Sequence, residues 1–189
     1  MIGIPIGLAV ANAGEWLMHK HVLHGLGRRR NSFWSFHWHE HHRACRQNQH
    51  IDEAYRGGAL RWNAQGKEAF ALFAASAAAL PLLPVAPFFV ATLLYCSIDY
   101  YRKHKRAHLE PNWAREHLSW HYDHHMGPNQ HANWCVTRPW FDILMKTRQP
   151  YAGTERERRD VARHRARAAS SSEGAVDAGV GQTGGVAGR

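Results

Sequence analysis

The sequence predicts an all-α protein built as an integral membrane helical bundle, and three observations support that fold class. The stretch from Ala69 to Ile98 contains no charged residue. The first segment, Met1 to Met18, is also predominantly apolar. Basic residues follow apolar segments instead of forming one stripe, which is typical of charges beside a membrane.

The first predicted membrane helix covers residues 1–18. Its length matches one membrane crossing, which needs roughly 17 to 25 residues. It has no basic leader and no small-residue cleavage motif, so we do not interpret it as a signal peptide.

The second and third predicted membrane helices form a hairpin. As one helix, the uncharged stretch would span roughly 45 Å, too long for one upright crossing and slightly short for two. Pro81, Pro84 and Pro87 interrupt its middle, so we predict helices at about 64–80 and 85–103. A buried hairpin in a soluble protein is the alternative. Both ends of a two-crossing unit return to one membrane face, which the flanking Lys and Arg residues assign to the cytoplasm.

The composition changes after residue 150. We therefore predict one domain over residues 1–150 and a tail over 151–189, which is charged at first and then rich in Gly and Ala. Beyond a short charged helix, such a tail is expected to be disordered, with His164 solvated.

The charge and cysteine content exclude some classes of protein. The net charge of +9 is divided between groups such as Arg28 to Arg30 and Arg102 to Arg106, each after an apolar segment. This division argues against a nucleic-acid partner. The three Cys residues do not form a pair at metal-binding spacing, which argues against a disulfide framework and fits a reducing compartment.

Histidine is the most informative residue type, with 16 in the chain. Four clusters stand out: His19 to His24, His37 to His42, His104 to His108, and His117 to His125. Residues three or four apart share a helix face, and imidazole is a preferred ligand of iron, zinc and copper. The hairpin brings these clusters to one face, so we predict a histidine-rich metal-binding cap. Solvated, pH-responsive side chains are the alternative.

These clusters resemble the histidine boxes of the fatty acid hydroxylase and sterol desaturase superfamily, which includes carotenoid hydroxylases. The similar features are His19-x4-His24, His41-His42, His104-x3-His108 and His121-x2-His124-His125. The segment NWCVTRPWFDILMKT, residues 133–147, is similar to the one that follows the last box. The resemblance covers most of residues 10–148.

The resemblance implies an oxygen-dependent hydroxylase of the fatty acid, sterol or carotenoid type, acting in lipid biosynthesis. It implies two iron ions, O2, a lipid substrate from the bilayer and an external ferredoxin-like or cytochrome-like electron donor. Zinc can replace iron in recombinant protein. Desaturation of a C–H pair is the alternative reaction. The resemblance also implies about four membrane crossings, where the sequence clearly supplies three.

The resemblance extends to a ligand set, with two points left open. His37 and His41 are four apart and share a helix face, whereas His39 lies roughly 200° from His37 and is the second choice. His19 and His24 diverge by about 140° on an ideal helix. They would therefore bind different metals, or the helix would loosen at its end. The expected ligands are His19, His24, His37, His41, His42, His104, His108, His121, His124 and His125.

Several further residues are candidates for supporting roles. A ligating imidazole usually donates its other N–H to an acceptor, and Glu15, Glu40, Asp99 and Asp123 lie close to the clusters, although each could equally be a surface acid. His117 is an additional ligand candidate. His21 is expected beside the ligands or in solvent, and His50 and His131 stand apart. The aromatic residues are expected to cover the site: Trp34, Phe36, Trp38, Trp120, Trp134 and Trp140.

Two rival functions fit the sequence less well. A non-catalytic membrane metal-binding or metal-transport protein would favour ionisable residues at mid-membrane depth, where this sequence has none. A soluble zinc hydrolase needs three ligands and an open position, fewer than the sequence offers. The basic groups could dock an acidic electron donor, and binding to anionic lipid is slightly favoured.

Overall fold

The computed structural model describes residues 1–166, and this part of the chain is helical without strands, which confirms the all-α prediction. The chain divides into two compact units, Met1–Ala152 and Gly153–Arg189. The described part of the second unit contains a helix over residues 155–166, on which His164 is exposed. The predicted disorder of the Gly- and Ala-rich tail lies outside the described residues.

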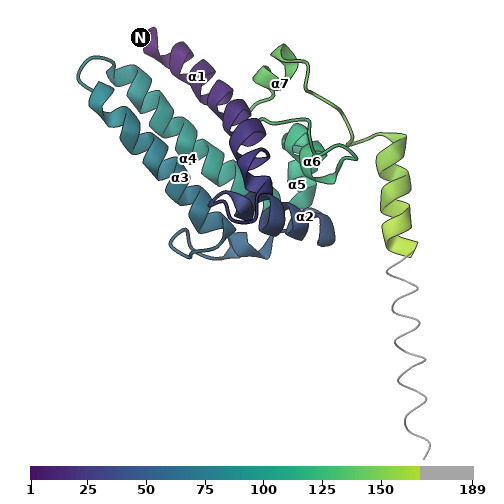
Figure 1. Cartoon of the computed structure of the whole chain (residues 1–189). Helices are drawn as coiled ribbons and strands as arrows, with labels where there is room; N and C mark the ends of the chain where they lie inside the picture. The colour runs from purple at the N-terminus through teal and green to yellow at the C-terminus, as the bar shows by residue number, and fades with distance from the viewer. Residues whose placement is uncertain (167–189) are drawn as a thin grey trace, which may run out of the picture. The chain divides into compact units, whose positions relative to one another are not determined.

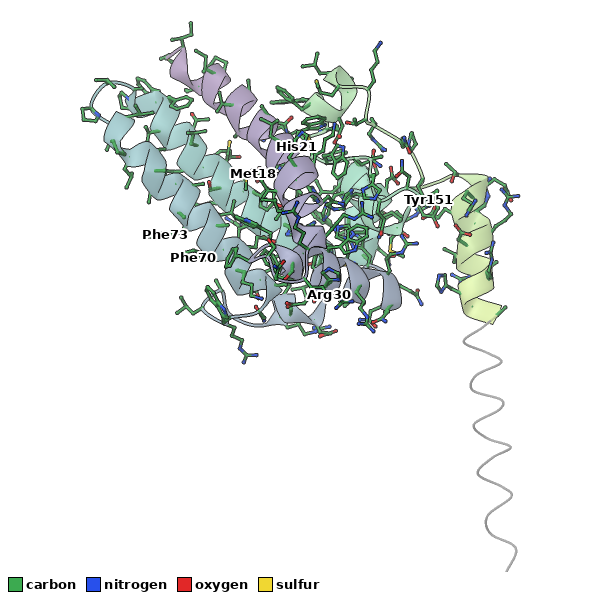
Figure 2. All side chains as sticks on the ribbon, viewed as in Figure 1. Met18, His21, Arg30, Phe70, Phe73 and Tyr151 are labelled. Carbon is green, nitrogen blue, oxygen red and sulfur yellow. The ribbon has the colours of Figure 1, made fainter. Side chains whose placement is uncertain are left out.

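Three long helices form the frame of the first unit (Figure 1). They are α1 (Gly3–Leu17), α3 (Ala64–Ala79) and α4 (Pro87–Leu109). The predicted hairpin is present: α3 and α4 lie side by side, joined through the short 3₁₀ helix η5 (Leu80–Leu82), and Pro87 begins α4. Phe70 and Phe73 point outward from α3 (Figure 2).

Glycine allows α1 to approach α4 closely. A Cβ added at Gly7 would lie 2.8 Å from Cβ of Thr92, and one added at Gly3 would lie 2.7 Å from the backbone N of Phe89. Real side chains do not tolerate such distances, so the backbone of α1 packs directly against the backbone of α4 at Gly3 and against a side chain of α4 at Gly7.

The predicted membrane crossings are wrong, because no helix within residues 1–166 combines the length and the apolar character that a crossing requires. α1 has 15 residues and α3 has 16, fewer than the roughly 17 to 25 needed. α4 has 23 residues, but its second half is charged. Helices do occupy the ranges predicted as spans, 1–18, 64–80 and 85–103. The integral membrane bundle and the placement of a metal site on its cytoplasmic face are not supported.

Shorter helices beside the frame supply most of the histidines. They are the π-helices η1 (Met18–Leu23) and η3 (His37–His42), the 3₁₀ helices η2 (Leu26–Arg28) and η4 (Glu53–Arg56), and the α-helices α2 (Arg43–Gln47), α5 (Pro111–His117), α6 (Ser119–Met126) and α7 (Trp140–Leu144). A π-helix bonds each N–H five residues back, as His24 N–H does to His19 O at 2.9 Å. Histidines five apart can therefore share a face.

Carboxylates hold the segment of residues 133–147 against α1. The backbone N–H groups of Val136 and Thr137 each donate to Glu15 at 2.9 Å. Within the segment, the N–H groups of Trp134 and Cys135 each donate to Asp142 at 2.8 Å. These bonds fix the carbonyl of Trp134 next to the first histidine cluster.

Candidate metal centre

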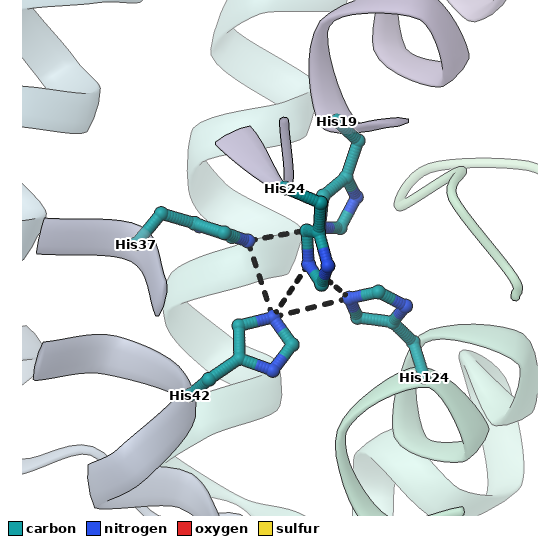
Figure 3. Close-up of side chains that lie close together, drawn as sticks. All are labelled: His19, His24, His37, His42 and His124. Atoms are coloured by element: carbon teal, nitrogen blue, oxygen red, sulfur yellow. Dashed lines mark hydrogen bonds between the residues drawn. The ribbon is translucent and has the colours of Figure 1, made fainter. Parts of the chain in front are cut away.

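The described residues contain a buried group of five histidines, here called cluster A. Their candidate ligand atoms all lie within 4.8 Å of one another. Figure 3 shows the five rings pointing toward a common centre from η1, the residue after it, η3 and α6. Cluster A consists of His19, His24, His37, His42 and His124.

A second buried group adjoins the first and is here called cluster B. Two overlapping sets of candidate ligands share His108 and His125. One set adds His104 and His121, and the other adds His41 and Cys45. Cluster B is defined as His41, His104, His108, His121 and His125, with Cys45 Sγ 3.3 Å from Nδ1 of His108. The ring centroids of His42 and His125 are 4.3 Å apart, so the clusters are neighbours.

All ten expected ligands lie in the two clusters. The pairing differs from the sequence interpretation in one respect: His37 joins His42, five residues on, while His41 lies in cluster B. Of the two arrangements expected for His19 and His24, the structure agrees with the helix that loosens, because both residues belong to cluster A and His19 lies in the π-helix η1. The π-turns of η1 and η3 explain both results, because histidines five apart face the same way there.

The outer ring nitrogens of several histidines have fixed acceptors. In cluster A, Nδ1 of His19 lies 2.6 Å from Trp134 O, and Nδ1 of His124 lies 2.6 Å from Ala132 O. A carbonyl oxygen can only accept, so both rings carry their proton on Nδ1. Their inward Nε2 atoms therefore present lone pairs, which is the tautomer that binds a metal.

The inward nitrogens lie unusually close together. In cluster A, Nε2 of His124 is 3.1 Å from Nε2 of both His24 and His42, and Nε2 of His19 is 3.0 Å from Nε2 of His37. In cluster B, Nε2 of His108 is 3.0 Å from that of His121 and 3.1 Å from that of His104. His104 and His108 both carry their proton on Nδ1, which faces Glu68 and His50 O, so their Nε2 lone pairs face each other and repel. A shared cation would convert that repulsion into attraction.

The spacing fits a metal ion with several imidazole ligands. Two nitrogens bound at about 2.1 Å are about 3.0 Å apart at a right angle and about 3.4 Å apart at the tetrahedral angle. Four of the five contacts in cluster A, at 3.0–3.1 Å, are closer to the first value, and the fifth, at 3.2 Å, lies midway between the two. In cluster B, Nε2 of His41 and Nε2 of His125 are buried without a hydrogen-bond partner, as expected of groups placed to bind an ion.

Burial favours the neutral form of most of the cluster histidines. Desolvation lowers the pKa of His124 to about 3, and it lowers the pKa values of His19, His37 and His108 well below the usual value. Neighbouring imidazoles lower the pKa values of His42, His121 and His125 further. Neutral rings are the form in which histidine binds metals.

No family model, curated protein or solved structure matches this chain. The assignment of the clusters therefore depends on their own geometry. Buried groups of histidines, with a cysteine beside one of them, could hold metal ions.

The other candidate histidines lie outside the clusters. Nε2 of His39 lies 3.0 Å from the carbonyl oxygen of Arg28 at the end of η2, so His39 is not an alternative to His37. Nδ1 of His117 lies 3.2 Å from Trp113 O, and the ring is exposed. His21 is exposed and packs edge-on against Trp16.

None of the four acids proposed from the sequence has a hydrogen bond or ion pair with a cluster histidine. Glu15 binds the backbone of Val136 and Thr137, and burial raises its pKa. The others pair with basic side chains: Glu40 with Lys67 at 3.3 Å, Asp99 with Lys103 at 2.9 Å and Asp123 with Arg148 at 2.7 Å.

Two acids that the sequence interpretation missed take the expected role. Nδ1 of His41 lies 2.8 Å from Asp52, and Nδ1 of His104 lies 2.6 Å from Glu68. Tyr55 donates to Glu68 at 2.5 Å. Asp52 and Glu68 are remote in sequence from the histidines that they orient, so spacing gave no signal. His50 was also missed as a support: its backbone oxygen accepts from Nδ1 of His108 at 3.0 Å.

A largely apolar cavity of about 250 Å³ reaches cluster A. It lies between α1, α3 and α4, and His19 and His37 form part of its wall. Glu68 also lines it, so the cavity touches a residue that supports cluster B. Apolar side chains along its walls include Ala11, Met18, Leu72, Ala75 and Leu93.

Proposed function

We propose that the chain is an oxygen-dependent hydroxylase that holds two iron ions in clusters A and B and oxidises a C–H bond of an apolar lipid chain. One observation supports this most strongly: two histidines of cluster A, His19 and His37, line the wall of a largely apolar cavity, and a second buried histidine cluster adjoins the first.

The residues that line the cavity suggest the substrate class. Its wall is mostly aliphatic, and such a surface binds apolar chains through burial from water. An unactivated C–H bond offers no group that an acid, base or nucleophile can attack, so a redox metal is needed. An acyl, sterol or carotenoid chain lying along α3 and α4 would place a carbon next to His19 and His37.

The ligand geometry favours iron over a structural zinc ion. Structural zinc usually takes four ligands in a tetrahedron. Five imidazoles in cluster A, with nitrogens 3.0–3.2 Å apart, suit a larger coordination number. Bound iron would supply the redox chemistry that activates oxygen.

The residues around the clusters orient the ligands and exclude water. Asp52 and Glu68 hold the rings of His41 and His104 by their Nδ1 atoms. Trp134 is buried, and the centroid of its ring lies 4.9 Å from the centroid of the His24 ring. The reaction converts C–H and O2, with two electrons and two protons, into C–OH and water. Each turnover consumes two electrons, and we propose that a separate donor protein supplies them.

The proposed function is tested by measuring product formation by the iron-loaded protein. Purified protein with measured iron content is incubated with palmitate, cholesterol or β-carotene, a chemical reductant and ¹⁸O2, and the products are analysed by mass spectrometry. We expect one labelled oxygen in a product, and loss of two hydrogens instead would indicate desaturation. Two bound irons without oxygen consumption or product would contradict the hydroxylase and favour non-catalytic metal binding.

A cavity variant tests the substrate site separately from the metal site. Ala75→Trp fills the cavity away from the histidines and should abolish product formation while both irons remain bound. His124→Ala should remove iron from cluster A as well as activity. Equal activity of Ala75→Trp and the unchanged protein would show that the substrate does not use this cavity.

A further inference from the structure

An aromatic pair connects cluster A to the surface. Trp38 packs against two ligand rings, with centroid distances of 5.1 Å to His24 and 5.4 Å to His42. The ring of His131 stacks on Trp38 at 5.7 Å with an interplanar angle of 9°. His131 is exposed, so this stack extends from solvent to the ligands of the candidate metal site.

This pair contacts ligands other than those that line the cavity. The cavity reaches His19 and His37, whereas Trp38 contacts His24 and His42. A molecule at Trp38 would therefore not compete with a substrate in the cavity.

Unpaired positive charge lies beside the stack. The guanidinium carbon of Arg28 lies 5.5 Å from the centre of the Trp38 ring, a cation–π contact. Arg28, Arg29 and Arg30 are exposed, and within residues 1–166 none of them forms an ion pair with a carboxylate. Three adjacent unpaired guanidinium groups attract an acidic surface.

The second basic group of the sequence is partly neutralised. Arg106 pairs with Glu110 at 2.9 Å, and Lys103 pairs with Asp99 at 2.9 Å. This difference distinguishes the two basic groups and favours the one next to Trp38.

We propose that the surface formed by Trp38, His131 and Arg28 to Arg30, here called the Trp38 surface, docks an acidic one-electron donor protein. The inference rests on the proposed function, which needs two electrons from outside the chain. The donor passes each electron through the stacked rings to the metal held by cluster A: the donor is oxidised and the metal is reduced. Binding to an anionic membrane, the other reading of these arginines, would not require aromatic contact with the ligands.

The test measures the reduction rate of the iron-loaded full chain by stopped flow, with a reduced acidic [2Fe–2S] ferredoxin as the probe. We expect the rate to fall with rising salt, because screening weakens attraction between exposed charges. Arg28→Glu combined with Arg30→Glu should slow reduction about tenfold or more. Reduction by dithionite, which needs no docking protein, should be unchanged.

The matched control is Arg102→Glu combined with Arg106→Glu, which makes the same change in charge on α4 and should leave the ferredoxin rate nearly unchanged. Equal slowing in both double variants, no slowing in the first, or no reduction by ferredoxin where dithionite succeeds, would overturn the docking surface. Failure of dithionite to reduce bound metal would instead contradict the proposed function. Phosphatidylserine vesicles that bind the protein through Arg28 and Arg30, with the ferredoxin rate unaffected, would assign this surface to lipid.

Discussion

His41 and His42 are adjacent in the chain but lie in different clusters. Nε2 of His42 lies 3.0 Å from Nε2 of His24 in cluster A, whereas the ring of His41 lies 4.4 Å from that of His108 in cluster B. His124 and His125 divide in the same way. Neighbouring side chains on a helix point in different directions, so each His-His pair can supply one ligand to each of two adjoining ions.

Removing one member of such a pair should weaken one metal site. We expect His42→Ala to lower bound iron from about two to about one per chain, with loss from cluster A, and His41→Ala to do the same at cluster B. Metal analysis after purification measures the ratio. His21→Ala is the control and should keep both ions, because His21 is exposed and outside the clusters. Unchanged iron content in both cluster variants would contradict the division.

The carboxylates behind the ligands should tune metal binding without contacting the ion. Glu68→Gln and Asp52→Asn remove the negative acceptors of His104 and His41. Loss of such an acceptor typically lowers metal affinity about 10- to 100-fold. Competition with a chelator measures the affinity. Glu40→Gln, at an exposed ion pair with Lys67, should bind as tightly as the unchanged chain, and an equal loss there would show a nonspecific charge effect.

The contact between α1 and α4 should be sensitive to one methyl group. A Cβ at Gly7 would lie 2.8 Å from Cβ of Thr92, so we expect Gly7→Ala to lower the free energy of unfolding by about 1–3 kcal/mol. Gly14→Ala lies on the same helix with no atom within 4 Å of the added Cβ. It should be neutral or stabilising by up to about 1 kcal/mol. Thermal unfolding compares the two, and equal values would show that α1 and α4 do not pack as described.

The metal-free protein should lose stability in acid. Burial lowers the pKa values of His50 and His124 to about 3 in the folded chain, while the unfolded chain binds protons near pH 6.5. Protons therefore favour unfolding as the pH falls from about 6.5 toward 3. Each such histidine costs about 1 kcal/mol between pH 6.5 and 5.5.

Urea unfolding at several pH values measures this loss. His50→Asn should reduce the pH dependence by the share of one histidine, whereas His21→Asn, at an exposed position, should leave it unchanged. A free energy of unfolding that stays constant from pH 7.5 to 5 would contradict the burial of neutral imidazoles.

The sequence was sufficient to predict the helices and which histidines come together, because both depend on local patterns. Pro81, Pro84 and Pro87 correctly divided the apolar stretch into α3 and α4. All ten expected ligands lie in the two clusters, since His residues at close spacing on short helices converge. The membrane prediction failed because the apolar parts of the helices are shorter than the predicted membrane-spanning ranges.

The division of ligands and their supports depended on features that spacing does not encode. The assumption of 3.6 residues per turn paired His37 with His41, whereas the π-turn of η3 pairs it with His42. Asp52 and Glu68 reach the histidines only through tertiary packing, so nearness in sequence suggested Glu40 and Asp123 instead. His39 and His117 have local backbone partners that no pattern indicated.

The most direct test of the two-site centre is an anomalous difference map from crystals of the iron-loaded protein, measured at the iron absorption edge. We expect two peaks, one surrounded by the Nε2 atoms of cluster A and one by those of cluster B. A single peak, or peaks bound by residues outside these ten histidines, would contradict the two-cluster centre.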